Sequence, residues 1–294
     1  MQFFLELSIN GLVIGMLYAL VAVAIVIVCK ATKVVSLAHG QLLAFGALFF
    51  YLGYVILGLP LWASGLMGLV LGALLGFSIE RVCLRPLIGQ PLFTGFLMTF
   101  AIFMVLDGVF ALILRGEAWG FPDFLPKGEL TVAGVRVYLS GLYSVGISLL
   151  VFLIVLLMFR YTKMGLGMRA TAESHQLAQS VGIKVRSIFS LVWILSAVVA
   201  VVAGVMLARY YDIRFMLTMV AFKAMVVAIV GGLDSLTGAI VGGLLLGWIE
   251  NVASGYLDPF VGGGIQEVAG YILLLLILLV RPYGIFGLVR VERI

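Results

Sequence analysis

Charged side chains are scarce in this chain: Asp, Glu, Lys and Arg together make up only 11% of its 294 residues. A soluble domain carries about 25% charged and about 45–50% apolar residues, whereas the apolar share here is 64%. Apolar runs recur along the whole length without the two-residue alternation of a transmembrane β-barrel. The composition therefore excludes a soluble globular protein. It predicts an all-α polytopic transmembrane helix bundle, organised as a single domain over residues 1–294.

Residues that perform covalent chemistry or hold metals are also few. The chain has two cysteines and two histidines, which are far apart in sequence, so we expect no metal-ligand cluster. The phosphate-binding pattern G-x-x-x-x-G-K-[ST] does not occur, and no nucleophile elbow or acid pair stands out. We therefore expect no catalytic residues, cofactor or metal. The net charge of +5 is expected to report membrane orientation rather than nucleic-acid binding.

A helix needs roughly 20 residues to cross the hydrocarbon layer, and the apolar runs predict about nine spans, within a range of eight to ten. The nine runs are residues 8–29, 36–57, 61–79, 92–114, 139–159, 188–208, 216–230, 239–252 and 268–280. The seventh run is short and ends at GGLDSLTG, so a re-entrant pair of short segments remains an alternative to a full crossing. Residues 115–138 are polar and are expected to form a small surface hairpin.

The basic residues predict the orientation of these spans. If the polar stretch 161–187 is cytosolic, twelve of the eighteen basic residues fall on the cytosolic side and five fall outside. The inside set is Lys30, Lys33, Arg81, Arg85, Arg160, Lys163, Arg169, Lys184, Arg186, Arg281, Arg290 and Arg293; the outside set is Arg115, Lys127, Arg136, Arg209 and Arg214. An excess of Lys and Arg marks cytoplasmic loops. We therefore expect the N-terminus outside and the C-terminus in the cytosol.

A few polar residues inside the spans are candidates for a substrate pathway. Asp107 and Lys223 are intramembrane charges, and such residues usually face a protein interior or a wet path. A structural ion pair or a bond to the carbonyls of a broken helix is an equally good explanation. His39 begins the second span, where a structural role is favoured over titration in the pathway. Asn10 and Tyr18 of the first span complete the set of pathway candidates.

Glycine is abundant, with 36 residues, and several are grouped near the seventh and eighth spans. Small residues let membrane helices approach closely, which is the commoner role. They also permit the broken helices that surround transport paths. The glycines proposed for a gate or a broken helix are Gly231, Gly232, Gly238, Gly242 and Gly243.

The longest polar segment is TKMGLGMRATAESHQLAQSVGIKVRS, from Thr162 to Ser187. Its residue types predict a helix from Arg169 to Val181, preceded by Gly165 and Gly167 and stopped by Gly182. Residues at a spacing of three or four form a small apolar face on this helix. They are Ala170, Ser174, Leu177, Ala178 and Val181. This face would either seat against a partner protein or belong to an ordinary surface loop whose basic residues set orientation.

Four segments, in the same order, resemble the high-affinity branched-chain amino acid permeases of the LivH type. They are NGLVIGMLYALVAVAIVIV, SLAHG, GLGMRATAES…AQSVGI and FKAMVVAIVGGLDSLTGAIVGGLLLG. Ser36 and Leu37 replace the usual Asn-Phe of the second motif, and Asp234 and Thr237 replace Gly and Pro in the fourth. These departures leave the substrate open, because relatives of the family import amides, urea and other amino acids.

The resemblance implies a transport subunit, namely the permease of an ATP-binding-cassette importer for branched-chain or related amino acids in a bacterial or archaeal cytoplasmic membrane. It implies three kinds of protein partner: a second homologous permease, two cytosolic ATPases and a periplasmic or extracellular substrate-binding protein. The loop 161–187 would couple to the ATPases. The residues implied for this coupling are Gly165, Arg169, Ala170, Ala172, Glu173, Ala178 and Gly182. The alternatives are an ion-coupled secondary amino-acid or amide transporter acting alone, and a membrane scaffold without a pathway.

The orientation can be tested by cysteine labelling, with Cys29 and Cys83 replaced by Ser. We expect Gln2→Cys to react with a membrane-impermeant thiol reagent in intact cells and Ile294→Cys to react only after lysis, because the basic residues favour a cytosolic C-terminus. Labelling of Ile294→Cys in intact cells would contradict the orientation.

Overall fold

The computed structural model of the chain describes residues 1–132 and 135–287, and these residues divide into two compact units. Unit 1 comprises residues 1–26, 125–150 and 223–294, and unit 2 comprises residues 27–124 and 151–222. Residues 288–294, which include Arg290, Arg293 and Ile294 of the orientation argument, lie outside the described part. The organisation of residues 1–294 as a single domain stays a prediction.

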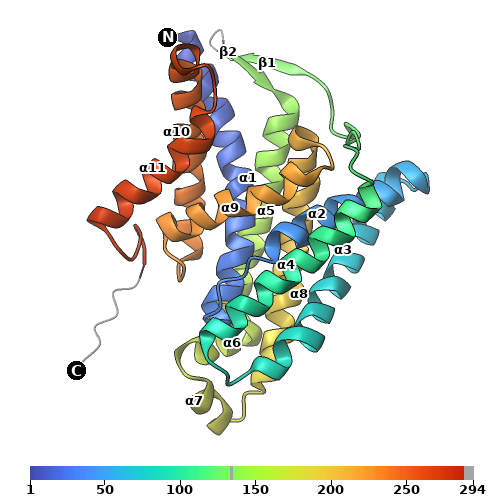
Figure 1. Cartoon of the computed structure of the whole chain (residues 1–294), viewed down its shortest axis with the longest axis vertical. Helices are drawn as coiled ribbons and strands as arrows, with labels where there is room; N and C mark the ends of the chain where they lie inside the picture. The colour runs from blue at the N-terminus through green and yellow to red at the C-terminus, as the bar shows by residue number, and fades with distance from the viewer. Residues whose placement is uncertain (133–134, 288–294) are drawn as a thin grey trace. The chain divides into compact units, whose positions relative to one another are not determined.

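In the described part of the chain, nine apolar helices correspond one by one to the nine predicted spans (Figure 1). The helical elements are α1 (Gln2–Thr32), α2 (His39–Tyr51) with its π-helical extension η1 (Leu52–Ile56), α3 (Leu61–Ser78) with η2 (Ile79–Leu84) and η3 (Arg85–Leu87), α4 (Leu92–Leu114), α5 (Leu139–Tyr161), α6 (Lys163–Glu173), α7 (His175–Ser180), α8 (Val185–Tyr211), α9 (Phe215–Gly231), α10 (Leu236–Val261) and α11 (Ile265–Val280). Among the described residues, seven helices are long and apolar enough to cross a membrane, while α9 and α11 are shorter, with 17 and 16 residues. The prediction of an all-α polytopic membrane bundle is confirmed.

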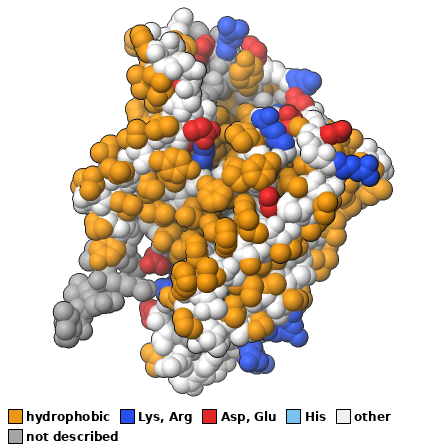
Figure 2. All heavy atoms as spheres, viewed as in Figure 1, with side chains coloured by type: hydrophobic (Ala, Val, Ile, Leu, Met, Phe, Trp, Pro, Cys, Tyr) orange, Lys and Arg blue, Asp and Glu red, His pale blue; other side chains and the backbone are white. Residues whose placement is uncertain are grey.

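Unit 2 shows how the sequence of a span separates its protein-facing side from its outer side. In α3, small residues recur every fourth position and are buried; they are Ser64, Gly68, Gly72 and Gly76. Large apolar residues recur with the same spacing on another face and are exposed; they are Trp62, Leu66, Val70 and Leu74. Because positions four apart lie on one face of a helix, the small residues pack inward and the large ones face outward. Figure 2 shows hydrophobic side chains over the surface formed by α3 and α4.

Close helix contacts in unit 2 depend on small residues. A Cβ added to Gly204 of α8 would lie 2.0 Å from the carbonyl oxygen of Leu43 in α2, and one added to Gly76 of α3 would lie 2.5 Å from Cβ of Ala197 in α8. Both distances are far below van der Waals contact. Membrane helices associate through such close packing because lipid offers little hydrophobic driving force between them.

Unit 1 uses the same kind of contact between α1 and α10. A Cβ on Gly247 would lie 2.4 Å from the backbone of Gly15, and one on Gly243 would lie 2.6 Å from Cβ of Ala19. Next to Gly247, Nε1 of Trp248 donates a 3.0 Å hydrogen bond to the Ser8 hydroxyl of α1. The segment after α11 returns to α9, where the backbone N–H of Ile285 donates to the Val230 carbonyl at 2.8 Å.

The predicted surface hairpin is present in unit 1. Strands β1 (Glu129–Val132) and β2 (Val135–Tyr138) pair antiparallel, with Glu129 opposite Tyr138. The prediction for the eighth span was too short, because α10 continues from Val252 to Val261. The polar residues after the apolar run ended the hydropathy signal there, although the helical hydrogen bonds continue.

Candidate functional site

The segment 161–187 folds as two short helices, α6 and α7, rather than the one predicted helix. Helix α6 begins at Lys163 because the Thr162 hydroxyl accepts a 3.0 Å hydrogen bond from the N–H of Gly165, and α7 begins after Ser174, whose hydroxyl accepts a 3.3 Å bond from the N–H of Leu177. These are N-cap bonds of the usual kind. The predicted start at Arg169 was therefore wrong, because an N-cap residue ahead of Gly165 starts the helix earlier.

The predicted stop at Gly182 is confirmed. Gly182 has φ +85°, and its N–H donates to the Gln179 carbonyl at 3.0 Å while the N–H of Ile183 donates to the Ala178 carbonyl at 2.9 Å. This pair of bonds is a Schellman motif, which commonly ends a helix at a left-handed glycine. Ile183 also packs against the buried group around Ala178. The turn into α8 is thus fixed by both hydrogen bonds and packing.

Glycines inside α6 fix this helix against its neighbours. A Cβ on Gly165 would lie 2.3 Å from the carbonyl oxygen of Phe159 at the end of α5, and one on Gly167 would lie 2.7 Å from Cδ1 of Ile188 in α8. The Arg169 guanidinium donates a hydrogen bond to the same Phe159 carbonyl. The two glycines therefore do not precede the helix, as the sequence suggested, but let it lie directly on the ends of two membrane helices.

The predicted apolar face is divided between the interior and the surface. Ala178 is only 2% exposed and packs with Val185 and Phe189 of α8. Leu177 and Val181, by contrast, are 70% and 74% exposed. The expectation that Ala178 faces a partner was therefore wrong, because the turn at Gly182 folds this side of α7 onto α8. The outward apolar surface consists of Leu177 and Val181, which are four residues apart.

The other residues assigned to coupling have different surroundings. Ala170 is partly buried and packs against the group around Ala178. Ala172 is partly buried, and Glu173 is exposed at the end of α6.

A cluster of charged residues lies within unit 1. Nζ of Lys223 in α9 is 3.2 Å from Oε2 of Glu250 in α10 and 3.4 Å from Oε1 of Glu267 in α11. The Lys223 and Glu250 side chains are only 11% and 1% exposed. The Tyr18 ring of α1 lies 5.8 Å from Lys223 Nζ, and the Tyr18 side chain hydrogen-bonds Glu250. We call these four residues the Lys223 cluster.

Sequence reasoning found two members of the Lys223 cluster, Tyr18 and Lys223, but missed Glu250 and Glu267. Glu250 lies inside the predicted eighth span, so its position in an apolar run was a usable signal. Its pairing with Lys223 was not, because the two residues are 27 positions apart. Asn10 is exposed on α1 and does not belong to the cluster.

The remaining pathway candidates lie in unit 2. Nε2 of His39 and the Ser196 hydroxyl are 2.5 Å apart, and the amide of Gln41 donates a 2.8 Å hydrogen bond to Oδ1 of Asp107. His39 thus bonds to a side chain of α8. As expected for intramembrane charges, both Asp107 and Lys223 have polar partners.

Asp107 also lines a cavity of about 370 Å³ in unit 2. Its wall carries charges of both signs, since Glu117 and Arg214 line it together with Asp107. Apolar side chains, among them Phe110, form the rest of the wall. This combination suits a small molecule that bears an ammonium group, a carboxylate and an apolar side chain.

The glycines proposed for a gate form a packed junction in unit 1. A Cβ on Gly231 would lie 2.2 Å from the Gly238 carbonyl oxygen, one on Gly242 would lie 2.8 Å from the Val227 carbonyl oxygen, and Gly243 contacts α1 as described above. Gly232 has φ +104° in the turn between α9 and α10. Close packing explains each position, and a role in gating stays a prediction.

Because Lys223 and Glu250 are largely buried, we expect removal of the Lys223 cation to lower the stability of the chain strongly. The size of the loss should depend on whether the Glu250 carboxylate is still present. Lys223→Met should destabilise the full chain in lipid nanodiscs by about 3–5 kcal/mol, because it leaves the buried Glu250 carboxylate without its cation. Adding Glu250→Gln should restore most of the loss, while Lys163→Met at an exposed position should change little. Thermal unfolding measures all three variants. Equal destabilisation by the single and double variants would show that the ion pair does not hold the cluster.

Comparison with known proteins supports a specific family. Residues 7–281 match the family described as "Branched-chain amino acid transport system / permease component". The high-affinity branched-chain amino acid transport system permease protein LivH of Escherichia coli (strain K12) is 28% identical over 99% of this chain and 98% of its own length. The corresponding protein BraD of Pseudomonas aeruginosa is 30% identical over the same shares of the two chains.

A structural likeness to PsaBC from Streptococcus pneumoniae in complex with Fab covers 97% of this chain and 94% of that one, with 15% identity and a TM-score of 0.45. This likeness is too weak to support a conclusion. The family match extends over nearly the whole described chain, and it includes both α6–α7 and the Lys223 cluster. The chain belongs to the permease component family of branched-chain amino acid transport systems.

Proposed function

We propose that this chain is a permease subunit of an ATP-binding-cassette importer that moves branched-chain or related amino acids across the cytoplasmic membrane. The family membership supports the transport role, because the relatives are named as permeases of branched-chain amino acid transport systems. The observation that carries the coupling to an ATPase is the exposed pair formed by Leu177 of α7 and Val181, the C-cap residue of that helix. Two large apolar side chains on a polar segment are suited to bind an apolar surface of another protein.

The construction of α6–α7 supports a role in transmitting force. Arg169 and Gly165 attach α6 to the end of α5, and Ala178 attaches α7 to α8. A partner that binds α7 would therefore act on the ends of two membrane helices at once. Arg169 in this account is a positioning residue, because its guanidinium bonds to the Phe159 carbonyl.

The proposed assembly contains this chain, a second homologous permease subunit and two cytosolic ATPases. A periplasmic or extracellular binding protein would deliver the substrate to the outer side. In the proposed orientation the N-terminus lies outside, the C-terminus lies in the cytosol, and α6–α7 faces the ATPases. The excess of basic residues on that side supports this orientation.

For the substrate route, we propose two charged regions that match the two charges of an amino acid. The cavity with Asp107 and Arg214 offers a carboxylate for the ammonium group and a guanidinium for the carboxylate. The Lys223 cluster, with one ammonium and two carboxylates, is the other region. Neither resembles a closed high-affinity pocket, which agrees with an affinity that resides mainly in the binding protein.

The alternative of an ion-coupled transporter acting alone is not favoured. The Lys223 cluster would serve such a transporter as well, because buried charges near midmembrane are common in that class. That class gives no role to the outward pair Leu177 and Val181, and the family relatives are permeases of multi-component transport systems by name.

The test changes the outward pair and leaves the interior of α7 intact. Leu177→Asp with Val181→Asp should abolish most transport and reduce co-purification of the ATPase subunits at least tenfold. Burial of carboxylates without partners should cost about 1–3 kcal/mol for each group. Insertion and thermal stability of the permease should change little, because both side chains are exposed.

Two other variants sharpen this test. Gln176→Asp adds charge to an exposed position of the same helix and should retain both transport and the ATPases. Ala178→Asp places a carboxylate in the packed group with Val185 and Phe189 and should lower the stability of the permease itself. Normal transport and full ATPase retention in the Leu177/Val181 double variant would refute the assignment of α7.

A further inference from the structure

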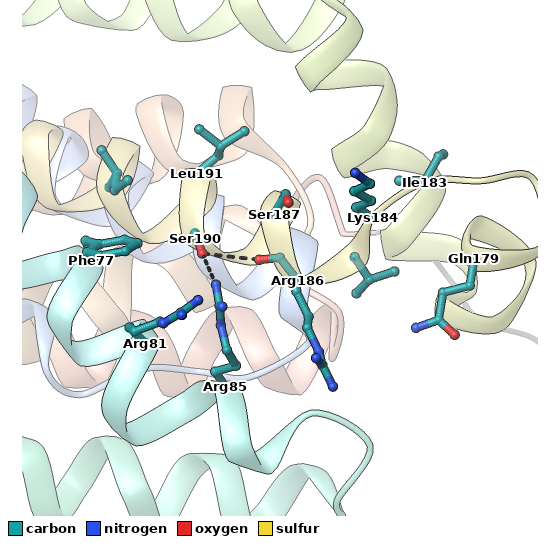
Figure 3. Close-up of a pocket in the computed structure, with 12 residues that line it drawn as sticks. Phe77, Arg81, Arg85, Gln179, Ile183, Lys184, Arg186, Ser187, Ser190 and Leu191 are labelled. Carbon is teal, nitrogen blue, oxygen red and sulfur yellow. Dashed lines mark hydrogen bonds between the residues drawn. The ribbon is translucent and has the colours of Figure 1, made fainter.

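A cleft of about 820 Å³ lies in unit 2 where α3 and its extensions η2 and η3 meet the start of α8 (Figure 3). Its polar rim is strongly basic and includes Arg81, Arg85, Lys184 and Arg186. Of the described residues that line it, none is acidic. The proposed amino-acid route does not use this cleft, and neither does the outward pair on α7.

Of the four basic side chains on the rim, one forms an ion pair with a carboxylate, and the other three form none with the described residues. Nε of Arg85 is 3.2 Å from Oε1 of Glu80, and its terminal nitrogen donates a 2.7 Å hydrogen bond to the Ser190 hydroxyl. Figure 3 shows Arg81 and Arg85 pointing from the α3 side toward Ser190 of α8. Within residues 1–132 and 135–287, no carboxylate forms an ion pair with Arg81, Lys184 or Arg186.

The inner wall of the cleft is apolar and belongs to the membrane helices. Phe77 comes from the last turn of α3, and Leu191 and Ile194 come from α8. Leu191 is 38% exposed, so this wall is open to a ligand. Ile194 lies nine residues after Val185, which places it about 13 Å along the helix from its start. The cleft thus runs from a cationic edge into the apolar part of two helices that are long enough to span a membrane.

We propose that this cleft binds an anionic phospholipid of the cytosolic leaflet, with the phosphate at Arg81, Lys184 and Arg186 and an acyl chain along Phe77, Leu191 and Ile194. Anionic lipids are attracted to basic pockets between membrane helices at the cytoplasmic side. A soluble anion would match the rim but would leave the apolar wall uncovered. An acidic segment of an ATPase would match the rim as well, but its soluble domain would not reach a wall within the membrane helices.

Because of where the cleft lies, a lipid bound in it would also affect the proposed coupling of α6–α7 to the ATPases. Lys184 is the residue just before α8, Arg186 lies in the first turn of α8, and Gln179 of α7 also lines the cleft. A bound headgroup would therefore bridge η2 at the end of α3 to the junction between α7 and α8. We expect a lipid at this position to hold that junction at the membrane surface.

The experiment measures lipid binding to the full chain by native mass spectrometry. The purified chain in detergent is titrated with phosphatidylglycerol and, separately, with phosphatidylcholine. Arg81→Gln with Arg186→Gln should weaken phosphatidylglycerol binding by roughly fivefold for each charge removed, since each basic residue contributes about that factor near an anionic surface. Phosphatidylcholine binding should change much less.

The matched control is Arg160→Gln with Lys163→Gln, which removes the same charge from exposed residues that do not line the cleft. It should retain the affinity for phosphatidylglycerol. Leu191→Ser, which shortens the apolar wall, should weaken phosphatidylglycerol binding without any change in charge. Thermal unfolding of every variant verifies that the chain remains folded.

Three results would overturn the proposal. Equal loss of phosphatidylglycerol in the cleft variant and the control would show a diffuse charge effect. Displacement of the lipid by inorganic phosphate at an equal concentration would indicate a site for soluble anions. Unchanged lipid binding together with loss of ATPase co-purification would assign the cleft to a protein interface.

Discussion

The attachment of α6–α7 to two membrane helices is the contact on which the proposed mechanism depends. On one side, Arg169 and Gly165 meet the Phe159 carbonyl at the end of α5. On the other side, Ala178 packs with Phe189 of α8. A Cβ at Gly165 would lie only 2.3 Å from the Phe159 carbonyl oxygen, and Ala178 is only 2% exposed. Force applied to α7 would therefore pass to the ends of α5 and α8 instead of being absorbed in a flexible loop.

The few polar groups within the apolar helices are largely paired inside their own unit. Lys223 pairs with Glu250 in unit 1, and Gln41 donates to Asp107 in unit 2. Such pairing offsets the cost of burying charge in a membrane protein. It also leaves little unpaired charge to bind an amino acid tightly. This supports the proposed division of roles, in which a separate binding protein selects the substrate and the permease provides a weakly binding route.

The sequence predicted the helices well and the tertiary contacts poorly, for physical reasons. Among the described residues, hydropathy located every apolar helix, and α4 agrees at both ends because Pro91 precedes it and Arg115 leaves the helix in a left-handed conformation. Gly165 was misread as a helix boundary because its role, a close contact with another helix, leaves no local pattern. The ion pair of Lys223 with Glu250 was missed for the same reason. Both depend on which helices become neighbours, which periodicity does not reveal.

Site-specific photo-crosslinking in the assembled transporter tests the central claim most directly. A photoreactive amino acid at Leu177 or Val181 should crosslink to an ATPase subunit, because these side chains extend outward from α7. The same group at Trp62, an exposed position on the outer face of α3, should not. If Leu177 and Val181 gave no ATPase crosslink in an intact, ATP-hydrolysing complex, α7 would not be the coupling surface and the account would fail.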